Sequence, residues 1–564
     1  MNRKMLPVGI ETFSEIVSAD YYYVDKTKMI EELLTNLAKV TLFTRPRRFG
    51  KSLNMSMLRS FFEIGTDKTI FEKLYIYGNR ELCDRYMGRY PVISISLKGV
   101  EAEDYNTACE MFSRIIANEA MRFSILKDSD VLDSEDKRQY MDLVIGTLNI
   151  PNLVYSILTL SRLLHKHYGE QVVVLIDEYD VPLAKANDRG YYDEMVLLLR
   201  NMLGNVLKTN DSLKFAVLTG CLRIAKESIF TGLNNFKVYS ITSSQFDSCF
   251  GFTDEEVENM LEYYGLNDDY ETVRNWYDGY RFGNAAVYCP WDVVNYCSDH
   301  IDNPGLYPEN YWSNTSGNDV LRRFIEDAEN QETLKMELTS LVNGHTVQKQ
   351  ISQELTYKEL YSSIDNIWST LLMTGYLTQR GRIDSKTYEL AVPNLEIRDI
   401  ITTHVLSLFK DSVGEDGALL ESFCNALIGE DVSKVEDLFT RYMKKTISVR
   451  DTFVRKTYKE NFYHGMILGI LGYKDGWVIA SNKESGDGYC DIMVQVANED
   501  TGIVIEVKYA DDGNMDGECA KALAQIGDKG YAESFYHGEV KRIIKYGIAC
   551  FRKQCRVAMA VENV

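Results

Sequence analysis

The chain has 564 residues, 45% of them hydrophobic, and a formal net charge of −21 at pH 7. This length exceeds what one hydrophobic core normally organises, so we expect roughly two to four domains. The acidic balance excludes affinity of the whole surface for nucleic acid, because binding to a polyanion depends on locally concentrated Lys and Arg. Any nucleic-acid site must therefore be local.

The eleven cysteines are scattered along the chain and form no C-x-x-C pair. This pattern indicates neither a disulfide framework nor a zinc site, and a reducing compartment is the simplest interpretation. Residues 1–9 lack an apolar signal region, and no apolar run approaches the ~20 residues needed to span a bilayer. We therefore expect a cytoplasmic protein without a membrane partner.

An apolar run at Val40–Thr44 predicts a strand, which leads into a loop that ends in Gly50, Lys51 and Ser52. A helical pattern follows over residues 53–62. This arrangement is typical of a P-loop: the glycine lets the backbone approach a phosphate, the lysine reaches the β and γ oxygens, and the serine places a hydroxyl on Mg²⁺. The sequence therefore predicts a site for ATP and Mg²⁺.

The loop departs from the usual G-x-x-x-x-G-K-S pattern at its first position, where Arg45 stands in place of glycine. Because Pro46 follows and biases this position toward extended geometry, the loop entry should be less sharply turned than usual. The loop also carries Arg47 and Arg48. These arginines could contact phosphate or only solvate the loop, and we include Arg48 in the candidate nucleotide site.

A second apolar strand, over residues 172–176, ends in Asp177 and Glu178. Asp177 would hold magnesium through water, and Glu178 would polarise the attacking water, a role for a carboxylate that is not itself consumed by metal binding. The apolar run fits a buried parallel strand without nucleotide equally well. Its position after the P-loop favours an ATPase.

A third predicted strand, over residues 215–219, ends in Thr219 and is followed by Arg223. Thr219 occupies the place where AAA-type ATPases carry a polar sensor of the γ-phosphate, and Arg223 is a candidate sensor of phosphate charge. A threonine that caps the next turn and a surface arginine explain these two residues equally well.

These N-terminal motifs resemble the AAA-ATPase-like family of largely uncharacterised, mostly bacterial proteins. The phrases that carry the resemblance are residues 23–27, 45–52, the strand ending in Asp177 and Glu178, residues 219–235, and residues 276–282. In that family this domain commonly precedes a PD-(D/E)xK nuclease domain, and an arginine at the position of Arg45 is usual. The resemblance implies an α/β fold in which a P-loop NTPase with a parallel sheet binds ATP.

Near the C-terminus, a predicted strand over residues 503–508 carries Glu506 and Lys508 on one side, because side chains alternate along a strand. Asp491 begins another strand-like run, and residues 497–502 predict the hairpin connection between the two. Folding about that connection brings Asp491 nearly opposite Lys508. Two carboxylates and a lysine thus converge, as binding of a hard metal such as Mg²⁺ requires.

These residues resemble the PD-(D/E)xK nuclease superfamily, with Asp491 in the aspartate position and Glu506, Val507 and Lys508 as the E-x-K element. The resemblance implies that Asp491, Glu506 and the carbonyl of Val507 bind Mg²⁺ or Mn²⁺, and that Lys508 orients or activates the attacking water. A solvated strand face with a chance Glu and Lys is the alternative. The predicted elements, in the α-β-β-β-α-β order of that fold, cover residues 456–471, 477–481, the hairpin, 518–531, 546–551 and 556–560.

Other polar residues near this motif are further candidates. Some superfamily members take a helix glutamate as an extra ligand, which makes Glu460 a candidate metal ligand, whereas His464 fits a hydrogen-bonded helix residue better. Glu484 could reach the metal or only flank a turn, and Gln525 could contact substrate or be an ordinary helix residue. Basic residues also cluster around this region, although solvated faces explain such clusters at least as often. They are Arg441, Lys444, Lys445, Arg450, Arg455, Lys456, Lys541, Arg542, Lys545, Arg552, Lys553 and Arg556.

The motifs divide the chain into three predicted segments. Residues 1–250 form the AAA-like ATPase domain, residues 251–445 a mainly helical lid and connecting module, and residues 446–564 a mixed α/β restriction-endonuclease-like domain. A capping box from Thr253 to Glu256 opens the helical module.

We predict an ATP-dependent or ATP-regulated, metal-dependent nuclease that cleaves nucleic acid, with DNA as the expected substrate. The alternative is a noncleaving P-loop ATPase switch or scaffold whose C-terminal domain binds nucleic acid or a protein partner. The sequence leaves open whether the chain forms a homo-oligomer.

Overall fold

The computed structural model describes residues 3–563 except for a set of short segments. These are residues 37, 209, 224–235, 304–305, 313–318, 330–331, 343, 361, 403, 405–416, 447–455, 472–473, 475–476, 486–487, 497–499, 530, 532–534 and 536–539. Contacts group the chain into two compact units, one of Met1–Val320 with Thr346–Arg398 and one of Leu321–His345 with Asp399–Val564. The expected middle segment is thus divided between the units, and its bounds at residues 250 and 445 stay a prediction.

A five-stranded, all-parallel sheet organises the first unit, in the order β2-β3-β4-β1-β5. Its strands are β1 (Val40–Thr44), β2 (Val92–Ser96), β3 (Val172–Asp177), β4 (Leu213–Gly220) and β5 (Phe236–Tyr239). The apolar runs of β1 and β3 are buried along their whole length, as strands covered on both faces must be. Since parallel strands end at the same edge, the segments that follow β1, β3 and β4 meet there.

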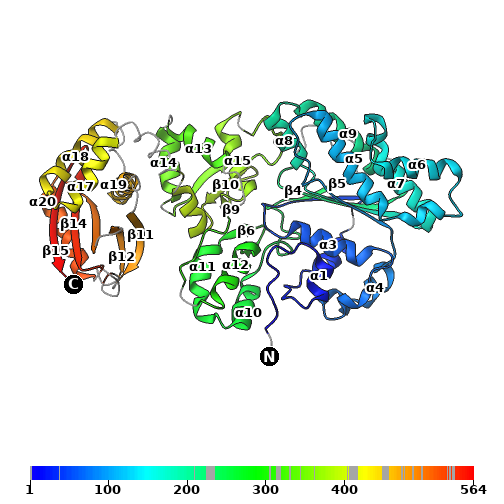
Figure 1. Ribbon diagram of the computed structural model, residues 1–564, viewed down its shortest axis with the longest axis horizontal. Coiled ribbons are helices and arrows are strands. Elements are labelled where there is room, and N and C mark those ends of the chain that lie inside the picture. The colour runs from blue at the N-terminus through cyan, green and yellow to red at the C-terminus, as the bar shows by residue number, and fades with distance from the viewer. Residues whose placement is uncertain are drawn as a thin grey trace. The chain divides into compact units, whose positions relative to one another are not determined.

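Helices cover both faces of this sheet, with α1 and α3 on one side and α5, α7 and α9 on the other (Figure 1). The helices of this region are α1 (Phe13–Ser18), α2 (Lys28–Thr35), α3 (Lys51–Phe62), α4 (Arg80–Tyr86), α5 (Tyr105–Met121), α6 (Ser134–Ile145), α7 (Ile150–Tyr168), α8 (Val181–Arg189) and α9 (Tyr192–Leu207).

No described helix by itself combines the length and apolarity of a membrane span; α6 and α7 do so only as a pair, across a bend of 117°.

The rest of the first unit contains more strands than the sequence predicts. Its helices are α10 (Asp254–Tyr264), α11 (Tyr270–Tyr277), α12 (Pro290–His300) and α15 (Ile364–Thr374). Its strands are β6 (Tyr280–Phe282), β7 (Ala285–Val287), β8 (Val347–Gln350), β9 (Thr378–Arg382) and β10 (Thr387–Ala391). The last three form an antiparallel sheet in the order β8-β10-β9, which the sequence did not predict, although the segment is mainly helical, as expected. These short strands mix polar and apolar residues, and pairing with neighbours decides their structure more than local pattern does.

Two local predictions for this region are confirmed. Thr253 and Glu256 form a reciprocal capping box at the start of α10. In the aromatic phrase at residues 276–282, Tyr277 and Tyr280 are buried, and Gly279 adopts a φ of +105°. A Cβ atom on Gly279 would lie 2.0 Å from the carbonyl oxygen of Pro393, so the turn requires glycine and the phrase serves packing.

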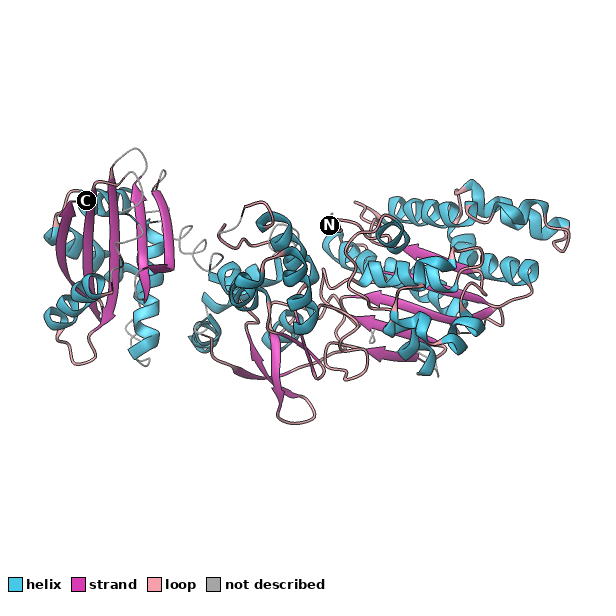
Figure 2. Ribbon diagram, turned by 90° about the horizontal axis from the view of Figure 1, so that it is seen from below, coloured by secondary structure: helices cyan, strands magenta, loops and turns pink. Residues whose placement is uncertain are grey.

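A mixed five-stranded sheet organises the second unit, in the order β11-β12-β13-β14-β15 (Figure 2). Its strands are β11 (Trp477–Ser485), β12 (Gly488–Val496), β13 (Thr501–Tyr509), β14 (Arg542–Phe551) and β15 (Gln554–Asn563). The β13–β14 pair is parallel and the other pairs are antiparallel. The helices are α13 (Asp319–Glu329), α14 (Glu332–Val342), α17 (Gly417–Ile428), α18 (Val432–Thr446), α19 (Lys456–Leu471) and α20 (Met515–Asp528). The predicted α-β-β-β-α-β order is confirmed in α19, β11 to β13, α20 and β14.

Candidate functional site

The phosphate loop joins β1 to α3 and is built around Lys51. Gly50 stands at the N-cap of α3 with a φ of +76°, a left-handed conformation that glycine adopts without strain. Lys51 is buried, with 4% of the residue exposed. Its ammonium group donates hydrogen bonds to the carbonyl oxygens of Arg45 and Pro46, at 3.2 and 2.9 Å. The loop therefore curls back over its own lysine, which is the geometry a P-loop needs.

Arg45 is a structural residue of this loop. Its guanidinium is fully buried and donates to the carbonyl oxygens of Thr44, Tyr239 and Phe246 at 2.8 to 3.0 Å. It also lies 4.8 Å from the ring centre of Phe250. Of the two roles that the sequence left open for the loop arginines, Arg45 has neither, because its side chain is buried and both of its terminal nitrogens donate to carbonyl oxygens inside the protein.

Ser52, Asp177 and Thr219 converge at the carboxyl edge of the parallel sheet. The hydroxyl of Ser52 donates to Asp177 Oδ2 at 2.7 Å, and the hydroxyl of Thr219 donates to Asp177 Oδ1. Thr219 Oγ1 also accepts from the backbone N–H of Glu178 at 3.3 Å. A serine hydroxyl and an adjacent carboxylate are oxygen donors that fit Mg²⁺. Thr219 is fully buried and braces Asp177, and its role as a γ-phosphate sensor stays a prediction.

Glu178 lies next to this group with a φ of +52°, in the left-handed region that is strained for a residue with a side chain. Its carboxyl group lines the same cavity as Lys51. Burial raises the pKa of Glu178, and the charge of Lys51 opposes that shift. A carboxylate held this way is suited to accept a proton from water.

A cavity of about 450 Å³ opens at the phosphate loop. One part of its wall is formed by Arg48, Gly50, Lys51, Ser52 and Glu178, and another part by Tyr22, Val24, Phe252, Met260 and Trp291. The volume is within the usual range for small-molecule sites, and a wall with charged and apolar parts fits a nucleotide.

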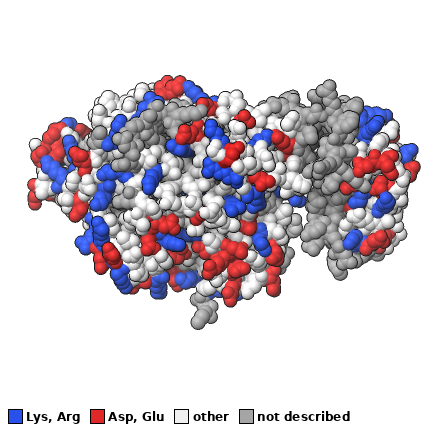
Figure 3. All heavy atoms as spheres, turned by 180° about the vertical axis from the view of Figure 1, so that it is seen from behind, with Lys and Arg blue, Asp and Glu red and all other residues white. Residues whose placement is uncertain are grey.

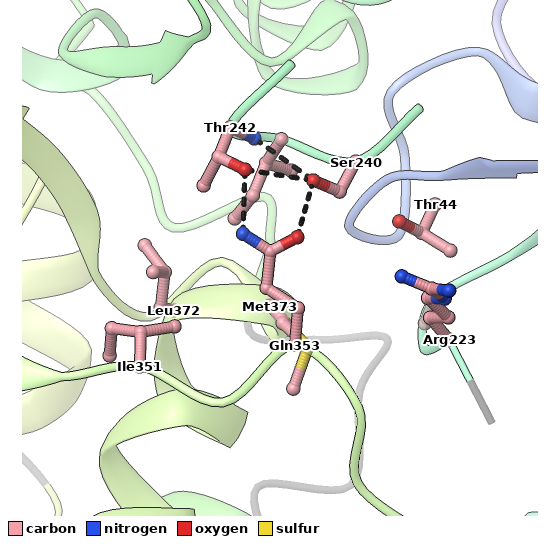
Figure 4. A pocket seen from close by; sticks show the side chains of 10 residues that line it. Thr44, Arg223, Ser240, Thr242, Ile351, Gln353, Leu372 and Met373 are labelled. Atoms are coloured by element: carbon pink, nitrogen blue, oxygen red, sulfur yellow. Dashed lines mark hydrogen bonds between the residues drawn. The ribbon is translucent and has the colours of Figure 1, made fainter. Parts of the chain in front are cut away.

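Arg223 lines a different and much smaller space, drawn in Figure 4. This space holds about 10 Å³, room for one water, and Ser240, Thr242 and Gln353 hydrogen-bond to one another on its wall. The guanidinium of Arg223 pairs with Glu354 at 2.9 Å. The structure therefore does not bring Arg223 into the cavity that contains Lys51.

In the second unit, Glu506 of β13 is the centre of a polar cluster. Its side chain is 2% exposed, and Oε1 accepts from Lys508 Nζ at 2.9 Å and from Gln525 Nε2 at 2.6 Å. Gln525, on α20, also donates to the hydroxyl of Tyr531 at 3.2 Å. Glu506 and Lys508 thus share one side of the strand, as predicted, while Val507 is buried.

Asp491 is in β12, and its side chain lies outside the described part of the structure. The antiparallel register pairs Ile492 with Ile505, so the next position along each strand aligns Asp491 with Glu506. The expectation that Asp491 lies nearly opposite Lys508 is therefore off by two residues, because the connection between the strands is shorter than assumed and Gln495 already pairs with Gly502. This register still places the two carboxylate residues on neighbouring strands.

Glu460 of α19 contacts the same strand, since its Oε1 accepts from the backbone N–H of Tyr509 at 3.1 Å. That bond ties α19 to β13 one residue beyond Lys508. His464, one turn further along α19, is buried. The side chain of Glu484 lies outside the described residues. The buried carboxylate of Glu506 is an oxygen donor of the kind that Mg²⁺ and Mn²⁺ prefer, and Glu460 contacts the same strand three residues further on. Among the described residues, no group of three or more His, Cys, Asp or Glu side chains gathers as a metal site would require.

Several of the basic residues around this domain are neutralised locally. Arg542 pairs with Glu430, Lys541 with Asp500, Lys545 with Glu562, Arg556 with Glu436, and Arg441 with Asp437. On the face drawn in Figure 3, basic and acidic side chains of the described residues are interspersed. The described residues therefore supply less free positive charge than the sequence clusters suggest. Arg450 and Arg455, and the side chains of Lys445 and Lys456, lie outside the described part.

The two sites and their sheets define a P-loop nucleotide-binding fold and a restriction-endonuclease-like fold on one chain. Comparison with known families agrees: a model described as a predicted AAA-ATPase matches residues 7–230, and one of the PD-(D/E)XK nuclease superfamily matches residues 458–559. The chain therefore contains an AAA-ATPase-like domain and a C-terminal domain of the PD-(D/E)XK nuclease superfamily. It is also 28% identical over 456 residues, 78% of each chain, to a protein of Azotobacter chroococcum mcd 1 described as "Uncharacterized protein in vnfD 5'region".

Sequence reasoning missed several residues of both sites. Asp180 is buried behind the phosphate loop and accepts from the backbone N–H groups of Cys221 and Leu222, both at 2.9 Å. Trp291 lines the nucleotide cavity, and Tyr531 holds Gln525. Asp180 could have been found from the sequence, because it lies three residues after Asp177. The positions of Trp291 and Tyr531 depend on tertiary packing and have no such local signal.

Proposed function

We propose that this protein is an ATP-dependent or ATP-regulated, metal-dependent nuclease that cleaves phosphodiester bonds of nucleic acid, with DNA as the substrate. The observation that carries the nuclease half is the cluster of Glu506, Lys508 and Gln525 on adjoining elements of the second unit. The convergence of Ser52 with Asp177 supports the ATPase half.

At the nuclease site, Glu506 and Asp491, with the carbonyl of Val507, would hold Mg²⁺ or Mn²⁺, and Glu460 would complete the set. The bound metal would supply Lewis-acid stabilisation of charge at the scissile phosphate. Lys508 would orient the attacking water and offset phosphate charge. Its present bond to Glu506 keeps the ammonium within reach of any group bound to that carboxylate.

At the nucleotide site, Gly50, Lys51 and Arg48 would contact the phosphates, while Ser52 and Asp177 would hold Mg²⁺. Glu178 would take the proton of the attacking water. The apolar and aromatic part of the cavity, which includes Tyr22, Val24, Phe252 and Trp291, would contact the base. Its position between the N-terminal segment and α12 suggests that both must be in place for nucleotide to bind.

The test is cleavage of labelled linear DNA, circular DNA and RNA by the full chain with Mg²⁺ or Mn²⁺, with and without ATP. We expect Glu506→Gln to lower the cleavage rate by about 100-fold or more, because the metal loses a charged ligand. Glu518→Gln is the matched control, since Glu518 pairs with the exposed Lys521 and lies outside the cluster. Cleavage that survives Glu506→Gln would mean that this site is not the nuclease.

The local ion pairing of the basic residues favours a second candidate, a noncleaving ATPase switch whose C-terminal domain binds a partner. ATP hydrolysis without cleavage of any of these substrates would support that candidate. Under it, Lys51→Ala should still abolish ATP hydrolysis, and Lys208→Ala, an exposed lysine at the end of α9, should not.

A further inference from the structure

A pair of buried carboxyl groups lies beside the phosphate loop, and neither group has a role in the function described so far. Asp292 is in the first turn of α12, and Glu396 follows β10. Both residues are 0% exposed. Burying one carboxylate is costly, and burying two in contact is costlier unless they share a proton or meet a cation.

The hydrogen bonds around the pair are incomplete. Glu396 Oε1 accepts from the backbone N–H of Trp312 at 2.8 Å. Among the residues that the structure describes, no hydrogen-bond partner reaches Glu396 Oε2 or either oxygen of Asp292. A proton placed on one carboxyl would make a hydrogen bond to the other, which satisfies both at once. Burial and mutual repulsion raise the pKa of Glu396, and burial raises the pKa of Asp292 to about 6.

The positive charge nearest the pair comes from the phosphate loop. Arg48 has a φ of +71°, and its guanidinium lies 4.0 Å from the ring centre of Trp291, the residue before Asp292. Arg48 Nη1 is buried and, among the described residues, makes no hydrogen bond. The thiol of Cys289 donates to the Arg48 carbonyl at 3.8 Å. The start of α12 therefore contacts Arg48 in three ways. Cys289 binds its carbonyl, Trp291 packs against its guanidinium, and Asp292 attracts its charge.

The other titratable groups that face the pair are neutral at physiological pH. They are Cys289, Tyr277 of α11 and Tyr280 of β6, and burial raises the pKa of each. Arg48 is thus the group whose charge opposes protonation of the pair. Arg48 also lines the cavity that contains Lys51 and Ser52.

We infer that Asp292 and Glu396 are positioning residues for the nucleotide site: they share a proton and hold Arg48 beside α12 until a triphosphate draws its guanidinium away. When Arg48 moves toward the phosphates, the pair loses its compensating charge and takes up a proton from solvent. Nucleotide binding and proton uptake are therefore linked, and binding is favoured as the pH falls toward the pKa of the pair. This inference rests on the proposed nucleotide site.

The test is calorimetric titration of the full chain with a nonhydrolysable ATP analogue and Mg²⁺, in two buffers of different ionisation enthalpy, at a pH near 6. If the loss of the Arg48 charge raises the pKa of the pair by about one unit, a usual size for a charge at close range, uptake is roughly 0.4 proton per nucleotide. Asp292→Asn and Glu396→Gln keep shape and acceptors but remove the shared proton. We expect both variants to bind nucleotide without this uptake.

Glu258→Gln, at an exposed acid of α10, is the matched control and should retain the uptake. Nucleotide binding by the unaltered protein without proton uptake would overturn the inference and leave the nucleotide site standing. Equal uptake in Asp292→Asn and Glu396→Gln would also overturn it. The absence of any binding heat in the unaltered protein, with no competition against a fluorescent nucleotide, would remove the proposed site and this inference together.

Discussion

Single side chains in this protein perform tasks that their sequence motifs do not reveal, and Arg45 is the clearest case. The P-loop pattern asks for glycine there, yet the arginine is buried and binds three carbonyl oxygens from three segments. Burial lowers the pKa of Arg45 to about 10, so the group stays charged at neutral pH. Arg45 therefore connects the start of the phosphate loop to the segments that contain Tyr239 and Phe246.

Arg45→Met tests how much these hydrogen bonds stabilise the protein. The substitution leaves three buried carbonyls short of a donor, and we expect the free energy of unfolding of the first unit to fall by about 2–4 kcal/mol. Denaturant unfolding followed by tryptophan fluorescence measures the loss. The exposed Arg47 provides the control, since Arg47→Met should change stability little. Unchanged stability in Arg45→Met would show that the carbonyls find other partners.

At the scale of elements, local signals in the sequence predicted the structure well wherever the pattern was strong. The strand at Val40–Thr44, the capping box of α10 and the helix Lys456–Leu471 are confirmed. The β8-β10-β9 sheet was missed because its strands are short and mixed in polarity. The pair of Asp292 and Glu396 was out of reach for a different reason: the residues are far apart in the chain, and only tertiary packing brings them together.

The start of α10 is fastened to the N-terminal segment, which gives an element-scale prediction. Lys26 Nζ donates to both carboxylate oxygens of Glu256 at 2.6 and 2.8 Å, while Glu256 also closes the capping box with Thr253. Thr253→Ala removes the cap and should destabilise α10 by about 1 kcal/mol. Hydrogen exchange of the amides at residues 254–264 measures the change.

A control for that experiment is available on the neighbouring helix. Exchange in α11, which has no side-chain cap at its N-terminus, should stay the same in Thr253→Ala. Equal acceleration in both helices would indicate general destabilisation of the unit and not the loss of one cap.

For the whole molecule, the two sites belong to different compact units, so any effect of ATP on cleavage has to be transmitted between units. We expect Lys51→Ala to remove the ATP-dependent part of cleavage and to leave the metal-dependent cleavage without ATP unchanged. Cleavage rates with and without ATP, in Lys51→Ala and in the unaltered protein, measure this coupling. A nuclease that cuts equally well in all four conditions would show that the ATPase does not regulate it.

The division of the first unit into Met1–Val320 and Thr346–Arg398 also affects how the protein is made. A ribosome releases the phosphate loop early, but Glu396, β9 and β10 leave the exit tunnel only after the intervening segment 321–345. Domains usually fold as units during synthesis, so the first unit cannot complete its folding until residues 346–398 have been made. The nascent chain therefore carries an incomplete first unit until residues 346–398 have left the tunnel, even though all residues that line the cavity at the phosphate loop have been made by then.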